Sequence, residues 1–197
     1  MMAFKGLTAD MVAAMGSGHK VLELGVTYRE ESSKTGRQGW HCTENPFDCL
    51  KYFSLGAGNR HFRVEAGGSI DEDEQERISC TEITLVEELT LQKLAGYGML
   101  YMVKHPLRQG WQQAGYRIRV QEDTAEAAGP DCIAIARGPR PQVRGPEGAV
   151  LGLILEPEPG CITAAKLFTA DRQQAGGWWT VDENRNLIEV DHEKEHS

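Results

Sequence analysis

The amino-acid sequence predicts a β-rich α+β protein, with a mixed sheet and two short helices in its N-terminal half and short strands in its C-terminal half. Three observations predict this class. Short segments in which apolar and polar residues alternate are typical of half-buried strands. Twenty-two glycines among 197 residues favour many tight turns. Two segments combine a helix-start signal with apolar residues at helical spacing.

Four strands and a possible first helix follow from the alternation in the N-terminal half. Residues 10–15 suit a short helix before a Gly/Ser break. The strands alternate between apolar and polar residues, although the pattern slips in the last of them. They span residues 3–7, 21–28 with a kink expected at Gly25, 61–68 and 76–88.

A helix over 46–54 is the clearest local prediction. Asn45 is a good N-cap, and Pro46 suits the first helical position because its φ is fixed and it lacks an N–H. Asp48 adds a carboxylate to the first turn, where it favours the helix dipole. The strand before this helix carries Trp40.

A second helix is expected over 91–105. Thr90 is its N-cap, Leu94 and Ala95 lie on one side, and Pro106 ends it. We expect this helix to pack on the N-terminal sheet.

The composition predicts two domains. Residues 1–105 form an α+β domain, and 106–129 form a connector in which Gln, Arg, Glu and Ala replace the apolar pattern. Residues 130–191 form a β-rich domain, and the tail 192–197 is expected to fray. The connector holds one expected strand at 116–121.

The β-rich domain is predicted to consist of short strands separated by turns that contain Gly and Pro. One of these strands resembles a solenoid coil, and residues 182–186 are expected to be a hairpin turn. The apolar segments lie at 131–139, 148–157, 161–169 and 177–190.

Charge and composition exclude several classes of function. A net charge of -8 argues against nucleic acid as a partner, because such proteins need Lys and Arg to displace phosphate counterions. No segment is long and apolar enough for a membrane span, and no signal peptide is visible, so we expect a cytoplasmic protein. Five scattered cysteines predict reduced, mostly buried thiols and no zinc site. Arg137, Arg140 and Arg144 suit a solvated face, with an anion site as the alternative.

Two motifs carry a family resemblance. Residues 39–48, GWHCTENPFD, are followed by Tyr52 and Phe53, and residues 178–183 read WWTVDE. Both resemble motifs of a family of bacterial and bacteriophage proteins classed as a domain of unknown function. The resemblance implies a phage or prophage context, and residues 131–138 resemble the last coil of that family's β-solenoid repeat. It implies no activity and no cofactor.

One candidate site lies around the first motif. His41 ends a strand just before the helix, Glu44 is near it, and Tyr52 lies one helical face away. The arrangement resembles ADP-ribosyltransferase folds, which implies an NAD site. The alternative is that His41 is a hydrogen-bonded surface residue beside an apolar core.

A cysteine–histidine nucleophile is a further possibility. Cys42 or Cys49 would have to meet His61 or His105 in space. Buried, inert thiols are the competing interpretation, because reactivity requires a lowered pKa.

The second candidate site is the tryptophan pair Trp178 and Trp179. Neighbouring residues on a strand face opposite sides, so one ring is expected in the core and the other can anchor a partner. No nucleotide, hydrolase or zinc motif is present. We therefore expect a non-enzymatic binding or structural module, without cofactor or metal, that contacts a protein partner or a second copy through its β-rich surface. The alternative is an enzyme with the NAD site at His41 and Tyr52.

Overall fold

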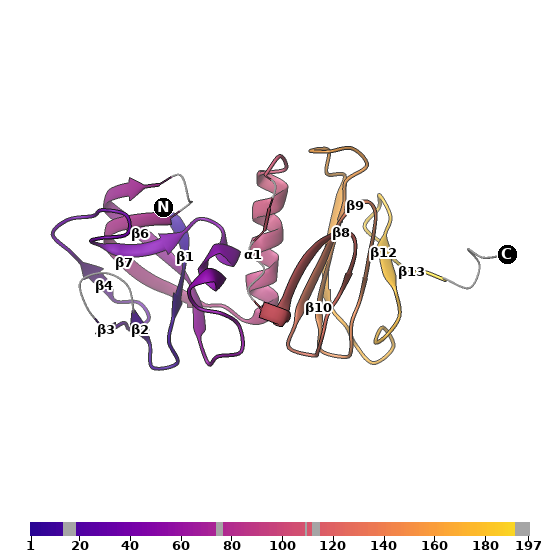
Figure 1. Ribbon diagram of the computed structural model, residues 1–197, viewed down its shortest axis with the longest axis horizontal. Helices are drawn as coiled ribbons and strands as arrows, with labels where there is room; N and C mark the ends of the chain where they lie inside the picture. The colour runs from indigo at the N-terminus through magenta and orange to yellow at the C-terminus, as the bar shows by residue number, and fades with distance from the viewer. Residues whose placement is uncertain (14–18, 74–76, 109, 112–114, 192–197) are drawn as a thin grey trace. The chain divides into compact units, whose positions relative to one another are not determined.

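The computed structural model describes residues 1–13, 19–73, 77–108, 110–111 and 115–191 (Figure 1). Strands hold 48% of the residues and helices 12%, so the protein is β-rich as predicted. The contacts divide the chain into a first unit, Met1–Thr90, and a second unit, Leu91–Ser197. The frayed tail expected at 192–197 lies outside the described residues.

The first unit is a curled, barrel-like sheet (Figure 1). Its strand order is β4-β7-β5-β1-β6, and an additional pairing between β6 and β7 brings the sheet back onto itself. All these strands pair antiparallel, so the mixed sheet expected in this half is wrong. The strands are β1 (Met2–Leu7), β4 (Thr27–Arg29), β5 (Trp40–Thr43), β6 (Arg60–Glu72) and β7 (Arg77–Glu88).

The interior of this sheet is an apolar core. On β1, Ala3 and Leu7 face the core because alternate residues of a strand share one side. The largest buried side chains there include Phe62, Ile83 and Leu85. Lys5 is two residues away from both Ala3 and Leu7, so its side chain lies on the same core-facing side of β1 and brings an amine to it.

The expected helix after β5 is a 3₁₀ helix, η1 (Pro46–Lys51). The carboxamide oxygen of Asn45 accepts from the N–H of Phe47 at 3.2 Å, which confirms the predicted cap. The helix is shorter than the expected 46–54 because Tyr52 already caps its C-terminal end.

Two other local predictions in the first unit are wrong. Residues 10–15 hold no helix where described, since Met11 has φ 63° and β2 (Val12–Ala13) pairs with β3 (Lys20–Val21); the remainder of that stretch lies outside the described residues. The strand expected at 21–28 is broken at Gly25, whose φ of 79° turns the chain before β4.

The second unit contains three consecutive strands that pair in parallel (Figure 1). These are β8 (Ile118–Glu126), β9 (Ile133–Arg144) and β10 (Val150–Leu155). Ile133 of β9 pairs with Ile118 on one side and with Val150 on the other, so the chain coils from strand to strand as in a solenoid. The single coil expected from the sequence is therefore extended by β8, which the sequence placed in a connector.

Three antiparallel strands complete this mixed sheet. They are β11 (Ala164–Thr169), β12 (Trp179–Val181) and β13 (Leu187–Glu189). The hairpin predicted at 182–186 joins β12 to β13. A short 3₁₀ helix, η2 (Gly115–Arg117), precedes β8.

Helix α1 (Leu91–Lys104) packs on β10 and β11 of the second unit. Its buried face includes Leu94, Met99 and Met102. Gly152 of β10 allows the close approach, because a Cβ there would lie 2.6 Å from the sulfur of Met99. The sequence did not indicate this packing, because the apolar surface that the helix covers is built from later strands.

Candidate functional site

A small cavity lies where β1 and β5 separate. These two strands pair only at Phe4 and Thr43. Beyond that pair is a cavity of about 30 Å³, which is the volume of one water molecule. Its polar lining includes Lys5, His41, Tyr52 and Arg77, together with Thr43 and the thiols of Cys42 and Cys49.

His41 is half-buried and held by the loop before it. Its Nε2 accepts from the N–H of Gly36 at 2.9 Å, so the neutral ring carries its proton on Nδ1. That Nδ1 is buried and has no partner in hydrogen-bond geometry among the described residues. Burial lowers the pKa of His41, and the charges of Lys5 and Arg77 lower it further.

Tyr52 lines the same cavity as His41, whereas Glu44 does not. Tyr52 stands at the C-terminal end of η1 and is 38% exposed. Glu44 is exposed to solvent beside the start of η1. The structure thus brings together two of the three residues considered for an NAD site.

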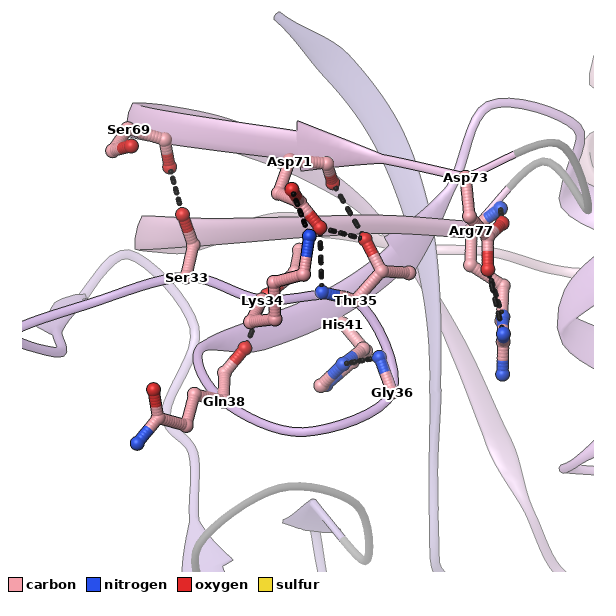
Figure 2. A network of polar contacts seen from close by, with 11 residues as sticks. Ser33, Lys34, Thr35, Gly36, Gln38, His41, Ser69, Asp71, Asp73 and Arg77 are labelled. Carbon is pink, nitrogen blue, oxygen red and sulfur yellow. Dashed lines mark hydrogen bonds and ion pairs between the residues drawn. The ribbon is translucent and has the colours of Figure 1, made fainter.

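A loop over residues 31–39 is fastened beside the cavity by Asp71 of β6. Figure 2 shows its carboxylate accepting from the backbone N–H of Thr35 at 2.7 Å, from the Thr35 hydroxyl and from Nζ of Lys34 at 3.0 Å. These bonds, the hydroxyl first, lower the pKa of Asp71 to about 2. Gly36, at the tip, lies close to both His41 and Arg77. The loop therefore covers the side of the cavity that these two residues form.

Lys5 is a cavity residue that sequence reasoning missed. It is 4% exposed, and its Nζ donates to the backbone carbonyl of His41 at 2.6 Å. Burial lowers its pKa, opposed by three neighbouring thiols. A lysine at a core-facing position of a strand was the available signal, but using it requires knowing which face of β1 is inside.

The cysteines of the first unit are buried thiols. A hydrogen bond with Cys80 and burial raise the pKa of Cys42, and burial raises the pKa of Cys49 to about 11. The hydrogen bond with Cys42 lowers the pKa of Cys80. His61 instead bonds the carbonyl of Phe53 at 2.8 Å. No cysteine–histidine pair forms among the described residues of this unit, so no histidine activates a thiol there.

A much larger pocket, of about 460 Å³, lies in the second unit. It is formed by the middle of β8 and of β9, by the chain that follows β10 and by the chain after α1. Its floor contains an ion pair in which Arg137 binds both carboxylate oxygens of Glu156, through Nε at 2.5 Å and Nη2 at 2.6 Å. Its remaining lining includes Trp111, Arg108, Gln121, Glu122, Asp123 and three prolines, Pro139, Pro157 and Pro159.

The three arginines expected on a solvated face have different environments. Arg137 is only 9% exposed and also donates to the carbonyl of Pro106. The prediction that it lies on a solvated face is therefore wrong. The reason is the β9–β10 pairing, which brings Glu156 beside it. Arg140 is exposed as expected, and Arg144 bonds Glu126 at 2.9 Å.

Trp178 and Trp179 are both half-buried. Trp179 packs against the core of the second unit and donates from its indole N–H to the carbonyl of Gln174 at 2.9 Å. The guanidinium of Arg144 lies 4.8 Å from the ring centroid of Trp178, as in a cation–π contact. A role for either ring in partner binding stays a prediction.

One protein family matches part of this chain. Residues 1–96 match the model of a domain of unknown function, DUF7666. The matched range spans the first unit, including the block at 39–48, and reaches into α1. Neither the curated proteins nor the solved structures gave a match. The bacterial or bacteriophage origin stays a prediction.

Two general features bear on the class of site. In the described ranges, no group of three or more His, Cys, Asp or Glu side chains is placed to hold a metal ion. No helix within those ranges has the length and apolar character needed to cross a membrane.

Proposed function

We propose that the protein is a non-enzymatic binding module whose ligand site is the pocket of the second unit. The volume of this pocket, about 460 Å³, carries the proposal, because small-molecule sites typically occupy roughly 300–1,000 Å³. The cavity beside His41 holds about one water and is too small for such a ligand without rearrangement.

The walls of the pocket suit a preformed site. Pro139, Pro157 and Pro159 restrict the backbone around it, which reduces the entropy lost when a ligand binds. Arg137 makes its bonds through Nε and Nη2, and among the described residues none accepts from Nη1. That group is left to donate to a ligand.

The polar lining indicates the chemistry of the ligand. Glu122 and Asp123 supply carboxylate acceptors, while Gln121 and Arg137 supply donors. Because neither sign of charge dominates, a small polar ligand with both donors and acceptors fits better than a simple anion or cation. Trp111 adds an aromatic ring to the lining, and the guanidinium of Arg108 lies 5.0 Å from the centroid of that ring.

The test is a thermal-shift screen with sugars, amino acids and nucleosides, followed by calorimetry on each hit. A ligand at one hundred times its Kd adds about 2.7 kcal/mol of stability, which raises the Tm by several degrees. We expect Trp111→Ala and Glu122→Gln to remove the shift. Glu147→Gln is the matched control, because Glu147 is exposed in the turn before β10, whereas the pocket lies beyond that strand's other end. Hits that survive both pocket variants would refute the proposal.

The alternative function is an enzyme with an ADP-ribosyltransferase-like NAD site. It is favoured by His41 and Tyr52 lining one cavity. Binding of NAD there requires the loop over 31–39 to move, because the cavity is small and Gly36 is bonded to His41. Calorimetry with NAD on the parent, His41→Ala and Tyr52→Ala decides this question. The alternative fails if the parent neither binds NAD nor turns it over.

A further inference from the structure

We propose that Lys5 is a carbonyl-reactive amine and that the cavity of the first unit captures formaldehyde, the one-carbon aldehyde, on it as a Schiff base. This site is separate from the pocket of the second unit, and its function does not depend on that pocket.

The geometry places the amine at the cavity. Lys5 is on β1, directly after the single residue pair that joins β1 to β5. The carbonyl of His41 on β5 bonds Nζ of Lys5 at 2.6 Å. Lys5 and His41 both line the cavity, so the amine stands at the gap between the two strands.

The surroundings of Lys5 favour a neutral amine. Its side chain is fully enclosed, and among the described residues no carboxylate bonds it. The groups near enough to act on its charge are the thiols of Cys42, Cys49 and Cys80. A buried ammonium without an anionic partner is costly, and this burial lowers the pKa of Lys5. A lysine that loses its proton more readily becomes a nucleophile at moderate pH.

The reaction needs no other reagent. The lone pair of Nζ attacks the carbonyl carbon of the aldehyde, a C–N bond forms, and a proton moves from nitrogen to oxygen to give a carbinolamine. Loss of that oxygen as water leaves the C=N bond of the imine. The cavity has about the volume of one water, which limits the substrate to the smallest aldehyde, formaldehyde.

A purely structural role for Lys5 is the competing explanation. Its bond to the His41 carbonyl replaces a strand-to-strand bond that is lost where β1 and β5 separate. A lysine that only makes this hydrogen bond needs no access from solvent and has no preference for reacting with an aldehyde. Labelling experiments therefore separate the two roles.

The test is reductive methylation of the full chain with ¹³C-formaldehyde and cyanoborohydride at pH 6.5, with the modified positions mapped by peptide mass spectrometry. Lys51 and Lys104 are exposed to solvent and serve as the reference lysines. Each unit by which the pKa of one amine lies below that of another raises its neutral fraction about tenfold at this pH. We expect Lys5 to be labelled at least tenfold faster than Lys51 and Lys104, with a rate that saturates as formaldehyde increases.

Controls keep the result interpretable. The α-amino group of Met1 serves as an internal reference. Lys5→Arg keeps a cation but should lose the label at this position. If that variant does not fold, the mapped labelling of the parent still decides the question. Labelling of Met1 and the exposed lysines while Lys5 stays unmodified, or a Lys5 rate that is unselective and linear in formaldehyde, would overturn the proposal.

Discussion

Arg137 and Glu156 form a buried ion pair, with 9% and 11% of their side chains exposed. Removing one partner leaves the other charge buried without compensation, which typically costs about 3–5 kcal/mol. We expect Arg137→Met to lower the free energy of unfolding by about this amount, as measured by urea denaturation. The double variant Arg137→Met with Glu156→Leu should recover most of the loss, because no uncompensated charge remains. Equal losses in the single and double variants would show that the two residues do not act as a pair.

Half-buried His41 and buried His61 predict a pH dependence of stability. Burial lowers the pKa of both below the usual 6.5, so the unfolded chain binds more protons than the folded chain. Their contribution is therefore complete above pH 6.5 and is lost as the pH falls through their folded-state pKa values. We expect the free energy of unfolding to decrease between pH 7.5 and 5, and the decrease to be smaller in His41→Gln and in His61→Gln. An unchanged slope in both variants would contradict this assignment.

Single residues were predictable where local chemistry determines them. Asn45 was identified as a cap from its own sequence neighbours. Lys5 and Arg137 were missed or misread because their environments come from distant strands: β5 supplies the carbonyl that Lys5 binds, and β10 leads to Glu156. Glu44 was selected for its proximity to His41 in sequence, but it is exposed and lies outside the cavity.

At the scale of elements, the loop over residues 31–39 depends on one carboxylate. Asp71 accepts the N–H and hydroxyl of Thr35 and the ammonium of Lys34 (Figure 2). We expect Asp71→Ala to increase hydrogen exchange at the amides of Thr35 and Gly36, because the first loses its acceptor and the second lies at the loop tip.

The matched control for Asp71→Ala is Asp182→Ala. Asp182 accepts from the backbone and side chain of Asn186 in the β12–β13 turn of the second unit. This control should leave exchange at residues 31–39 unchanged. Exchange at Thr35 that is equal in the parent and Asp71→Ala would show that other contacts hold the loop.

Elements were predictable to the extent that their signals are local. Asn45 and Pro46 marked the start of η1, and a continuous apolar segment marked the start of β9. The strand expected over 21–28 is interrupted at Gly25, where the sequence predicted a kink and where the positive φ turns the chain. The expected helix over 10–15 failed because Val12 pairs with Val21, a contact that is absent from either segment alone.

At the scale of the whole molecule, the parallel stack of β8, β9 and β10 shows why the domain boundary is hard to read from sequence. The segment 106–129 is rich in Gln, Arg, Glu and Ala, which suggested a connector. Its strand β8 nevertheless pairs along β9, with Ile118 and Val120 buried in the second unit. A solenoid repeat is recognised by repetition, and too few coils are present here to establish a period.

The contacts of α1 lead to a prediction about independent folding. Because α1 packs on β10 and β11, a fragment over 91–197 should keep the core of the second unit, whereas a fragment over 106–197 should expose the sheet face that the helix covers. We expect 91–197 to unfold cooperatively in a circular-dichroism melt, and 106–197 to bind ANS and melt without a sharp transition. The reciprocal pair of fragments is 1–90 and 1–105. The fragment 1–105 carries the apolar face of α1 without β10 and β11 to cover it. It should therefore aggregate more readily than 1–90. Cooperative unfolding of 106–197 equal to that of 91–197 would instead support a boundary within 106–129, with α1 as a part of the N-terminal domain.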